Sequence, residues 1–121
     1  NFPVTADLNM KVSTKYGMLQ PNVSSTQAVR AVFIIDPESV IRAIIYYPLT
    51  TGRNFDAIRR AIVALQKADA EHCSTPAGRV PGKDVIIPTP TTCEEVECGM
   101  ANCSDNEYSL DWFLRFRKES K

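Results

Sequence analysis

Two apolar runs joined by a four-residue turn constrain the fold of this chain more than any other feature. Residues 28–35 and 40–47 are rich in β-branched and aromatic side chains, as strands are. Between them, Asp36-Pro37-Glu38-Ser39 carries Pro at the second turn position with Asp before it, which type I turns favour. The pattern predicts an antiparallel β-hairpin over residues 28–47.

One helix is predicted on each side of this hairpin. Asn9 to Tyr16 predicts a short helix that ends at Gly17, preceded by a short strand at Phe2 to Ala6 and followed by a loop over residues 21–27. After the hairpin, Asn54 is a favourable N-cap for a longer helix, from Phe55 to about Ala70. Helical spacing predicts an apolar stripe that is buried and a polar face that points outward. The stripe consists of Phe55, Ile58, Ile62 and Leu65, and the outward residues are Arg59, Arg60, Gln66 and Lys67.

From Ser74 onward the composition changes. Four prolines and two glycines between residues 76 and 90 predict an extended arm around one short strand, Asp84 to Ile87. Thr92, followed by Cys93-Glu94-Glu95, has the spacing of a cap for a short helix. Tyr108 to Phe116 is rich in aromatic residues and predicts a docked segment, because a free tail would expose too much apolar surface.

The composition argues against several classes of function. Lys and Arg total 14 and Asp and Glu total 14, so the chain shows neither the basic surplus of a nucleic-acid binder nor an acidic tail. Its apolar runs are strand-sized, too short to span a bilayer, so no membrane partner is expected. No signal-peptide pattern opens the chain, which favours a cytoplasmic location. Because it does not begin with Met, a processed or cut product is expected.

The chain has four cysteines, Cys73, Cys93, Cys98 and Cys103, and one histidine, His72. Zinc sites pair their ligands at short spacings, which these residues do not match, so we expect neither a metal ion nor a cofactor. Cys73 is interpreted as an ordinary thiol, whereas the other three cysteines can form a disulfide with one another.

Several segments of the chain, which follow one another in the order that the family has, resemble the peroxiredoxin family, and in particular its 1-Cys type and archaeal members. The central match runs from Val29-Arg30-Ala31-Val32-Phe33-Ile34-Ile35-Asp36-Pro37 through Val40-Ile41-Arg42, Tyr47-Pro48 and Thr51-Gly52-Arg53-Asn54-Phe55-Asp56. Upstream, the matching residues are Phe2-Pro3-Val4, Asp7 and Tyr16-Gly17-Met18. Downstream, they are Thr75-Pro76-Ala77, Pro81-Gly82-Lys83-Asp84-Val85-Ile86, Pro88 and Tyr108-Ser109-Leu110-Asp111-Trp112-Phe113.

This resemblance implies an α/β chain with a partial thioredoxin-like fold, in the order strand, helix, hairpin, helix. Residues 1–72 would then be the C-terminal half of the peroxiredoxin domain, and residues 73–121 an extended C-terminal dimerisation arm. The first hairpin strand would lack its parallel neighbour, and a bare apolar edge is unfavourable. We therefore expect a homodimer or higher oligomer, strand exchange, or pairing with a complementary peroxiredoxin subunit.

The resemblance also implies an activity. Peroxiredoxins carry a peroxidatic cysteine in a Pro-x-x-x-Thr-x-x-Cys motif, and none of the four cysteines here has Thr three residues before it. The chain is thus expected to be part of a thiol-dependent peroxidase that reduces hydrogen peroxide and organic hydroperoxides with a thiol reductant. It would lack the segment with the peroxidatic cysteine and be inactive alone. The alternatives are a non-catalytic interaction module that pairs with full-length subunits, and a redox or metal switch built from the C-terminal cysteines.

Arg30 and Arg53 are the candidate site residues. Strand alternation places Arg30 on the face of Val32 and Ile34, where a charge needs a partner or an exit to water. By resemblance, Arg30 binds peroxide and stabilises the cysteine thiolate, and Arg53 lies beside the same pocket. From the residues alone, Arg30 would reach solvent from a strand end, Arg53 would be a solvated loop residue, and Arg42 a solvated cross-strand charge.

The C-terminal segment departs from the archaeal pattern. Ser109 and Arg115 stand where those members carry a pair of cysteines, so the resemblance does not support a resolving role for this tail. The spacing around Asp111 and Trp112 is kept. Trp112 and Phe113 are instead predicted to anchor the arm at a dimer interface.

Overall fold

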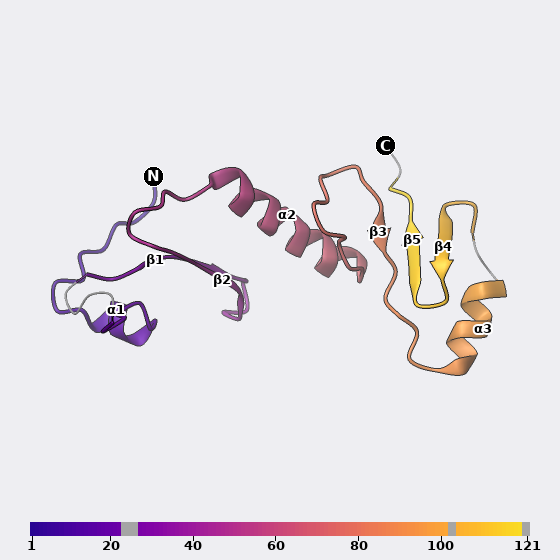
Figure 1. The fold of residues 1–121 in the computed structure, drawn as a ribbon, viewed down its shortest axis with the longest axis horizontal. Coiled ribbons are helices and arrows are strands. Elements are labelled where there is room, and N and C mark those ends of the chain that lie inside the picture. The colour runs from indigo at the N-terminus through magenta and orange to yellow at the C-terminus, as the bar shows by residue number, and fades with distance from the viewer. Residues whose placement is uncertain (23–26, 102–103, 120–121) are drawn as a thin grey trace. The chain divides into compact units, whose positions relative to one another are not determined.

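The computed structural model describes residues 1–22, 27–101 and 104–119 and divides the chain into two compact units, Asn1–Asn54 and Phe55–Lys121. The first unit contains α1 (Lys11–Lys15), β1 (Arg30–Ile35) and β2 (Ile41–Tyr47). The second contains α2 (Phe55–Glu71), β3 (Val85–Ile86), α3 (Cys93–Ala101), β4 (Glu107–Asp111) and β5 (Leu114–Arg117), as labelled in Figure 1. The predicted α/β composition is confirmed.

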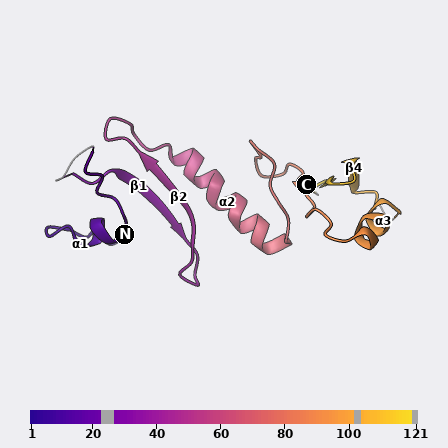
Figure 2. The same cartoon turned by 60° about the horizontal axis from the view of Figure 1, so that its bottom comes forward.

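The predicted hairpin is the framework of the first unit. Strands β1 and β2 pair antiparallel from Arg30 opposite Tyr47 to Ile35 opposite Ile41, and their arrows run in opposite directions in Figure 2. The Ser39 N–H donates to the Asp36 carbonyl at 3.0 Å, closing the turn. The Asp36 carboxylate also accepts from the N–H groups of Glu38 and Val40, so its own side chain stabilises the turn.

The helix predicted before the hairpin forms, but it is short. The Asp7 carboxylate accepts hydrogen bonds from the N–H groups of Val12 and Ser13 and from the Ser13 hydroxyl, and Gly17 follows with a left-handed φ of 64°. The strand predicted at Phe2 to Ala6 is wrong, since this segment has no regular secondary structure. A strand needs a partner backbone, and none of the described residues supplies one here. Of the predicted loop over residues 21–27, residues 23–26 lie outside the described part of the chain.

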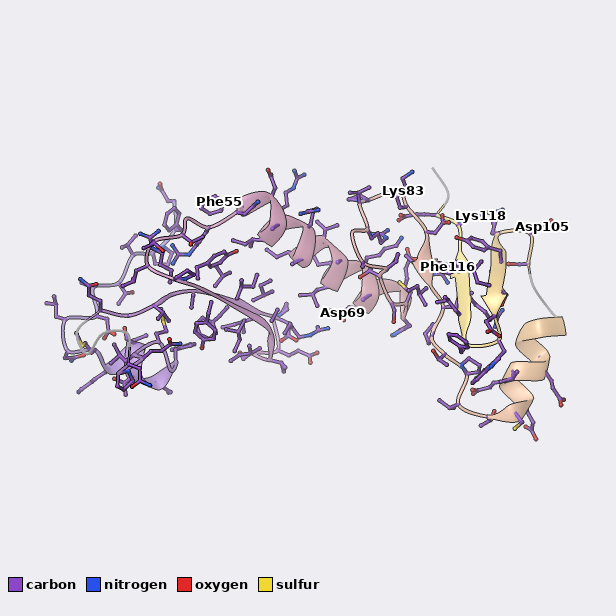
Figure 3. All side chains as sticks on the ribbon, in the orientation of Figure 1. Phe55, Asp69, Lys83, Asp105, Phe116 and Lys118 are labelled. Atoms are coloured by element: carbon purple, nitrogen blue, oxygen red, sulfur yellow. The ribbon has the colours of Figure 1, made fainter. Side chains whose placement is uncertain are left out.

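The long helix α2 has nearly the predicted limits. It ends where His72 adopts a left-handed φ of 48° and the Cys73 N–H donates to the Ala68 carbonyl at 3.3 Å, a Schellman-type end. The predicted burial of its apolar stripe is wrong: Phe55, at the start of α2 in Figure 3, is 76% exposed and Ile62 is 37% exposed. Burial of a helix face requires a second layer against it, and no residue of α2 is buried.

A three-stranded antiparallel sheet in the order β3-β5-β4 organises the remainder of the second unit. Val85 on the edge strand β3 is only 1% exposed, and Cys73 is also buried, next to Ser74, which forms a bridge with Ile86. The sequence predicts β3 and a docked aromatic segment, and the structure resolves that segment into the β4–β5 hairpin. Tyr108 and Phe116 stack across it with ring centroids 5.1 Å apart, and the Tyr108 hydroxyl donates to Asp84 Oδ2 at 2.9 Å.

The predicted cap of α3 is confirmed. Thr92 Oγ1 accepts from the Glu95 N–H at 3.2 Å, while the Glu95 carboxylate accepts from the Thr91 N–H at 2.7 Å. The hydrogen bonds that the Glu95 carboxylate accepts hold its pKa below its usual range, with the backbone N–H of Thr91 as the largest cause. None of the helices in the described ranges is long and apolar enough to cross a membrane.

Candidate functional site

Arg30 lies at the start of β1, where it is tied to the loop after β2. Its position is set by the preceding residue, Val29, which is buried and donates its N–H to the Met18 carbonyl at 2.9 Å. The Arg30 Nη1 donates to the Thr51 carbonyl at 3.1 Å. The Thr51 N–H in turn donates to the Pro48 carbonyl, so the acceptor belongs to a closed turn. The polar partner that the strand pattern requires for Arg30 is thus a backbone carbonyl.

Arg53 binds in the opposite direction, from the loop after β2 back to β1. Its Nη2 donates to the Ala31 carbonyl at 3.5 Å, a long hydrogen bond. The two candidate arginines therefore meet at one corner of the first unit, each bound to the backbone of the other's segment. Neither has a carboxylate partner among the described residues. Because a guanidinium has five N–H donors, both retain donors for an anionic or strongly polar ligand.

A cavity of ≈ 270 Å³ opens beside this corner. Its walls come from the strand ends and from the turn that follows β2, with mainly apolar atoms and one side-chain amide. The lining residues are Gln20, Val29, Tyr46, Tyr47, Pro48 and Leu49. They include Val29, the residue before Arg30, and Tyr47, the residue paired with Arg30, whereas the two arginines are not among the lining residues.

The structure separates the other residues that the sequence singles out. Arg42 pairs with Asp36 at 3.5 Å near the hairpin turn, so it is ion-paired rather than only solvated. His72 is exposed, whereas its neighbour Cys73 is buried, with its thiol 3.8 Å from the Lys67 carbonyl. Cys93 and Cys98 are exposed on α3, and Cys103 lies outside the described residues. Within the described ranges, no three His, Cys, Asp or Glu side chains gather as a metal site would require.

The C-terminal residues that the resemblance singles out contact residues near them in the chain. Ser109 donates its hydroxyl to the Asp111 carbonyl at 2.6 Å, and Arg115 donates to Glu107 at 3.0 Å. Trp112 and Phe113 form an edge-to-face pair at the β4–β5 turn and are each about half exposed. Their role at a dimer interface stays a prediction.

An ion-pair cluster in the second unit was not predicted from the sequence. Lys67, predicted to point outward, pairs with Glu71 one turn later and with Glu119 near the C-terminus. Arg117 also pairs with Glu71, with Nη2 2.8 Å from Oε2. The hydrogen bonds from Lys67 hold the pKa values of both Glu119 and Glu71 below their usual range. Only the spacing of Lys67 and Glu71, four residues apart on a helix, signals part of this cluster in the sequence.

Comparison with known sequences identifies relatives of this chain. A model of the AhpC/TSA family matches residues 1–44. A peroxiredoxin of Methanosarcina mazei is 54% identical over 120 residues, which cover 99% of this chain and 55% of that protein. A peroxiredoxin of Aquifex aeolicus is 42% identical over 127 residues, covering 97% of this chain and 56% of its own length. The chain therefore spans about half the length of these relatives.

Solved structures give the same result. A cysteine-to-serine mutant of the peroxiredoxin 6 of Arenicola marina superposes with a TM-score of 0.76 at 30% identity, over 96% of this chain and 55% of that one. A yeast mitochondrial 1-Cys peroxiredoxin superposes with a TM-score of 0.73 at 35% identity, over 91% of this chain and 53% of that one. The mixed α/β fold thus matches part of a larger fold.

Proposed function

Since this chain belongs to the peroxiredoxin family, we propose that it is the C-terminal part of a thiol-dependent peroxidase that reduces hydrogen peroxide and organic hydroperoxides. In this proposal residues 1–72 complete a thioredoxin-like domain and residues 73–121 are its dimerisation arm. The observation that carries the proposal is the convergence of Arg30 and Arg53 at one corner of the first unit, with no carboxylate partner among the described residues.

The proposed chemistry uses these arginines to stabilise negative charge. A cysteine thiolate attacks one peroxide oxygen, the O–O bond breaks, and the departing alkoxide or hydroxide takes up a proton to leave as alcohol or water. The sulfur gives up two electrons and becomes a sulfenic acid, which a thiol reductant converts to a disulfide with release of water. Guanidinium N–H groups stabilise both the thiolate and the charge that develops on the leaving oxygen.

In this proposal the nucleophile comes from sequence outside these 121 residues, because none of the four cysteines lies in the peroxidatic motif. The test is a chimera in which this chain replaces the matching part of the Methanosarcina mazei peroxiredoxin, to which it is 54% identical. We expect the chimera to consume hydrogen peroxide rapidly in a stopped-flow assay, and this chain alone to show no turnover.

Substitutions in the chimera test the arginines. Loss of an oriented donor to developing charge typically costs about 10²- to 10³-fold in rate, so Arg30→Gln is expected to slow peroxide reduction by roughly that factor. The matched control is Arg42→Gln, because Arg42 is an arginine of the same hairpin that pairs with Asp36 instead. Rapid peroxide turnover by the 121-residue chain alone, or equal rates for the two variants, would contradict the proposal.

The second candidate function is a non-catalytic module that pairs with other peroxiredoxin subunits. It is favoured by the two-stranded sheet of the first unit, in which β1 has only β2 as a hydrogen-bonded strand neighbour among the described residues. Ile44 and Tyr46 on this hairpin are also each 45% exposed. Light scattering of the purified chain tests this function: a dimer or larger species is expected, and a stable monomer at high concentration would count against it.

A further inference from the structure

The carboxylate of Glu119 is held by three donors from two separate segments of the second unit. Lys67 Nζ on α2 lies 2.5 Å from Oε1. In the loop before β3, Arg79 Nη2 lies 2.5 Å from Oε2 and the Gly82 N–H donates to the same oxygen at 2.9 Å. Two cationic groups and one backbone N–H that converge on both oxygens of one carboxylate have the composition of an oxyanion-binding site.

The donors are held in place by contacts that do not involve Glu119. The side chain of Arg79 is only 4% exposed, and its Nε donates to the Lys83 carbonyl at 3.0 Å. Gly82 adopts a left-handed φ of 82°, a conformation that glycine takes without strain. After removal of Glu119 we expect Arg79 to keep its bond to the Lys83 carbonyl while its guanidinium lacks an anion.

The surrounding charges favour an anion. Lys118 and Arg117 line a cavity of ≈ 270 Å³ together with Lys67, Glu71 and Glu119, and Figure 3 shows Lys118 and Lys83 at the same end of the three-stranded sheet. Three cationic and two acidic side chains line this cavity, and Arg79, which pairs with Glu119 from outside the lining, brings the excess to two positive charges. Without Glu119 the excess rises to three. Glu71 cannot easily replace Glu119, because it already pairs with Lys67 and Arg117.

We infer that Lys67, Arg79 and the Gly82 N–H form an oxyanion receptor whose resident ligand is the carboxylate of Glu119. When Glu119 is absent, the receptor binds a small carboxylate or phosphate from solution. The inference concerns the second unit only and does not depend on the proposed peroxidase activity.

The test compares the unsubstituted chain with Glu119→Ala. Each ¹⁵N-labelled chain is titrated at neutral pH with sodium acetate or inorganic phosphate, at constant ionic strength maintained with chloride, and the Gly82 amide resonance is followed. In Glu119→Ala we expect a saturable shift with at least one of the two anions, at an apparent affinity at least tenfold higher than in the unsubstituted chain. The acetate and phosphate arms distinguish a planar from a tetrahedral ligand.

Two further variants make the result specific. Adding Arg79→Gln to Glu119→Ala is expected to abolish the saturable shift, because the buried donor is lost. Glu107→Ala, which removes a carboxylate from the separate Arg115 pair, is the matched control and is expected to leave the Gly82 response as in the unsubstituted chain.

If Glu119→Ala does not fold in chloride alone, recovery of its helical circular-dichroism signal on addition of acetate or phosphate replaces the shift as the readout. At least one of these anions should then restore the fold at a concentration at which chloride does not. Responses of Glu119→Ala to acetate and phosphate no greater than its response to chloride would overturn the inference.

Discussion

Substitution of Gly99 by alanine sets helix propensity against a close side-chain contact. In a helix interior alanine is favoured over glycine by about 1 kcal/mol. A Cβ at position 99 of α3 would lie 3.1 Å from the Arg115 Cζ and nearer still to Nη1, so the guanidinium has to move. We expect this movement to break the 3.0 Å hydrogen bond between Arg115 Nη2 and the Glu107 carboxylate.

The magnitude follows from these two opposing effects. A hydrogen bond between charged groups, here with the Arg115 side chain 14% exposed, contributes about 2 kcal/mol. Subtracting the helix-propensity gain leaves an expected net destabilisation of about 1 kcal/mol for Gly99→Ala. In an Arg115→Ala background the contact is absent, and the same substitution should instead stabilise α3 by about 1 kcal/mol.

The assay is native-state amide hydrogen exchange of α3, complemented by urea unfolding, for the four chains of this double-mutant cycle. A change of sign between the two backgrounds is the expected result. If Gly99→Ala changes stability with the same sign and size with Arg115 present and absent, the close approach of Gly99 and Arg115 has no energetic consequence.

Three further predictions follow from local contacts. The hydrogen bonds that Asp7 accepts, chiefly from the Ser13 N–H, hold the pKa of its carboxyl below the usual range. The contribution of Asp7 to stability is therefore fully present above its unfolded-state pKa, and it is lost as pH falls through the lower folded-state pKa. The protection factor of the Ser13 amide, the factor by which its exchange is slower than in an unfolded chain at the same pH, should therefore fall only in strong acid, whereas in Asp7→Asn it should be low at all pH values. Equal protection factors in the two chains near neutral pH would refute this. The hydrogen bond to Asp84 raises the pKa of Tyr108, so the contribution of this bond to stability is lost as pH rises through the raised pKa. Ultraviolet titration should show a late phenolate step that Tyr108→Phe removes. An unchanged titration profile in Tyr108→Phe would contradict this. His72 occupies a left-handed helix end, so His72→Gly should raise the free energy of unfolding by about 1 kcal/mol and His72→Ala should not, as urea unfolding of both variants would show.

Local sequence signals predicted the hairpin and the helix limits well. The turn at Asp36 needs only its own side chain and neighbouring N–H groups, and the end of α2 needs only residues 68 to 73. Such contacts connect residues a few positions apart, so a short pattern contains most of the information. The cap of α3 at Thr92 was predictable for the same reason.

Burial was predicted less well, because it depends on what packs against an element. The apolar spacing of α2 is helical, yet Phe55 and Ile62 are exposed. The aromatic tail was predicted to dock, but its arrangement as β4 and β5 was not. Strand pairing joins residues such as Ile86 and Phe116, which lie far apart in the chain, and no local pattern specifies that partner.

For the candidate site, the sequence supplied the two candidates and one requirement: the resemblance singled out Arg30 and Arg53, and strand alternation predicted that Arg30 needs a polar partner or an exit to water. That the partners are the carbonyls of Thr51 and Ala31, and that Lys67 pairs with Glu119, became known only from the folded chain. Residue type sets what a side chain can bind, whereas chain folding sets which distant groups come within hydrogen-bond distance of it.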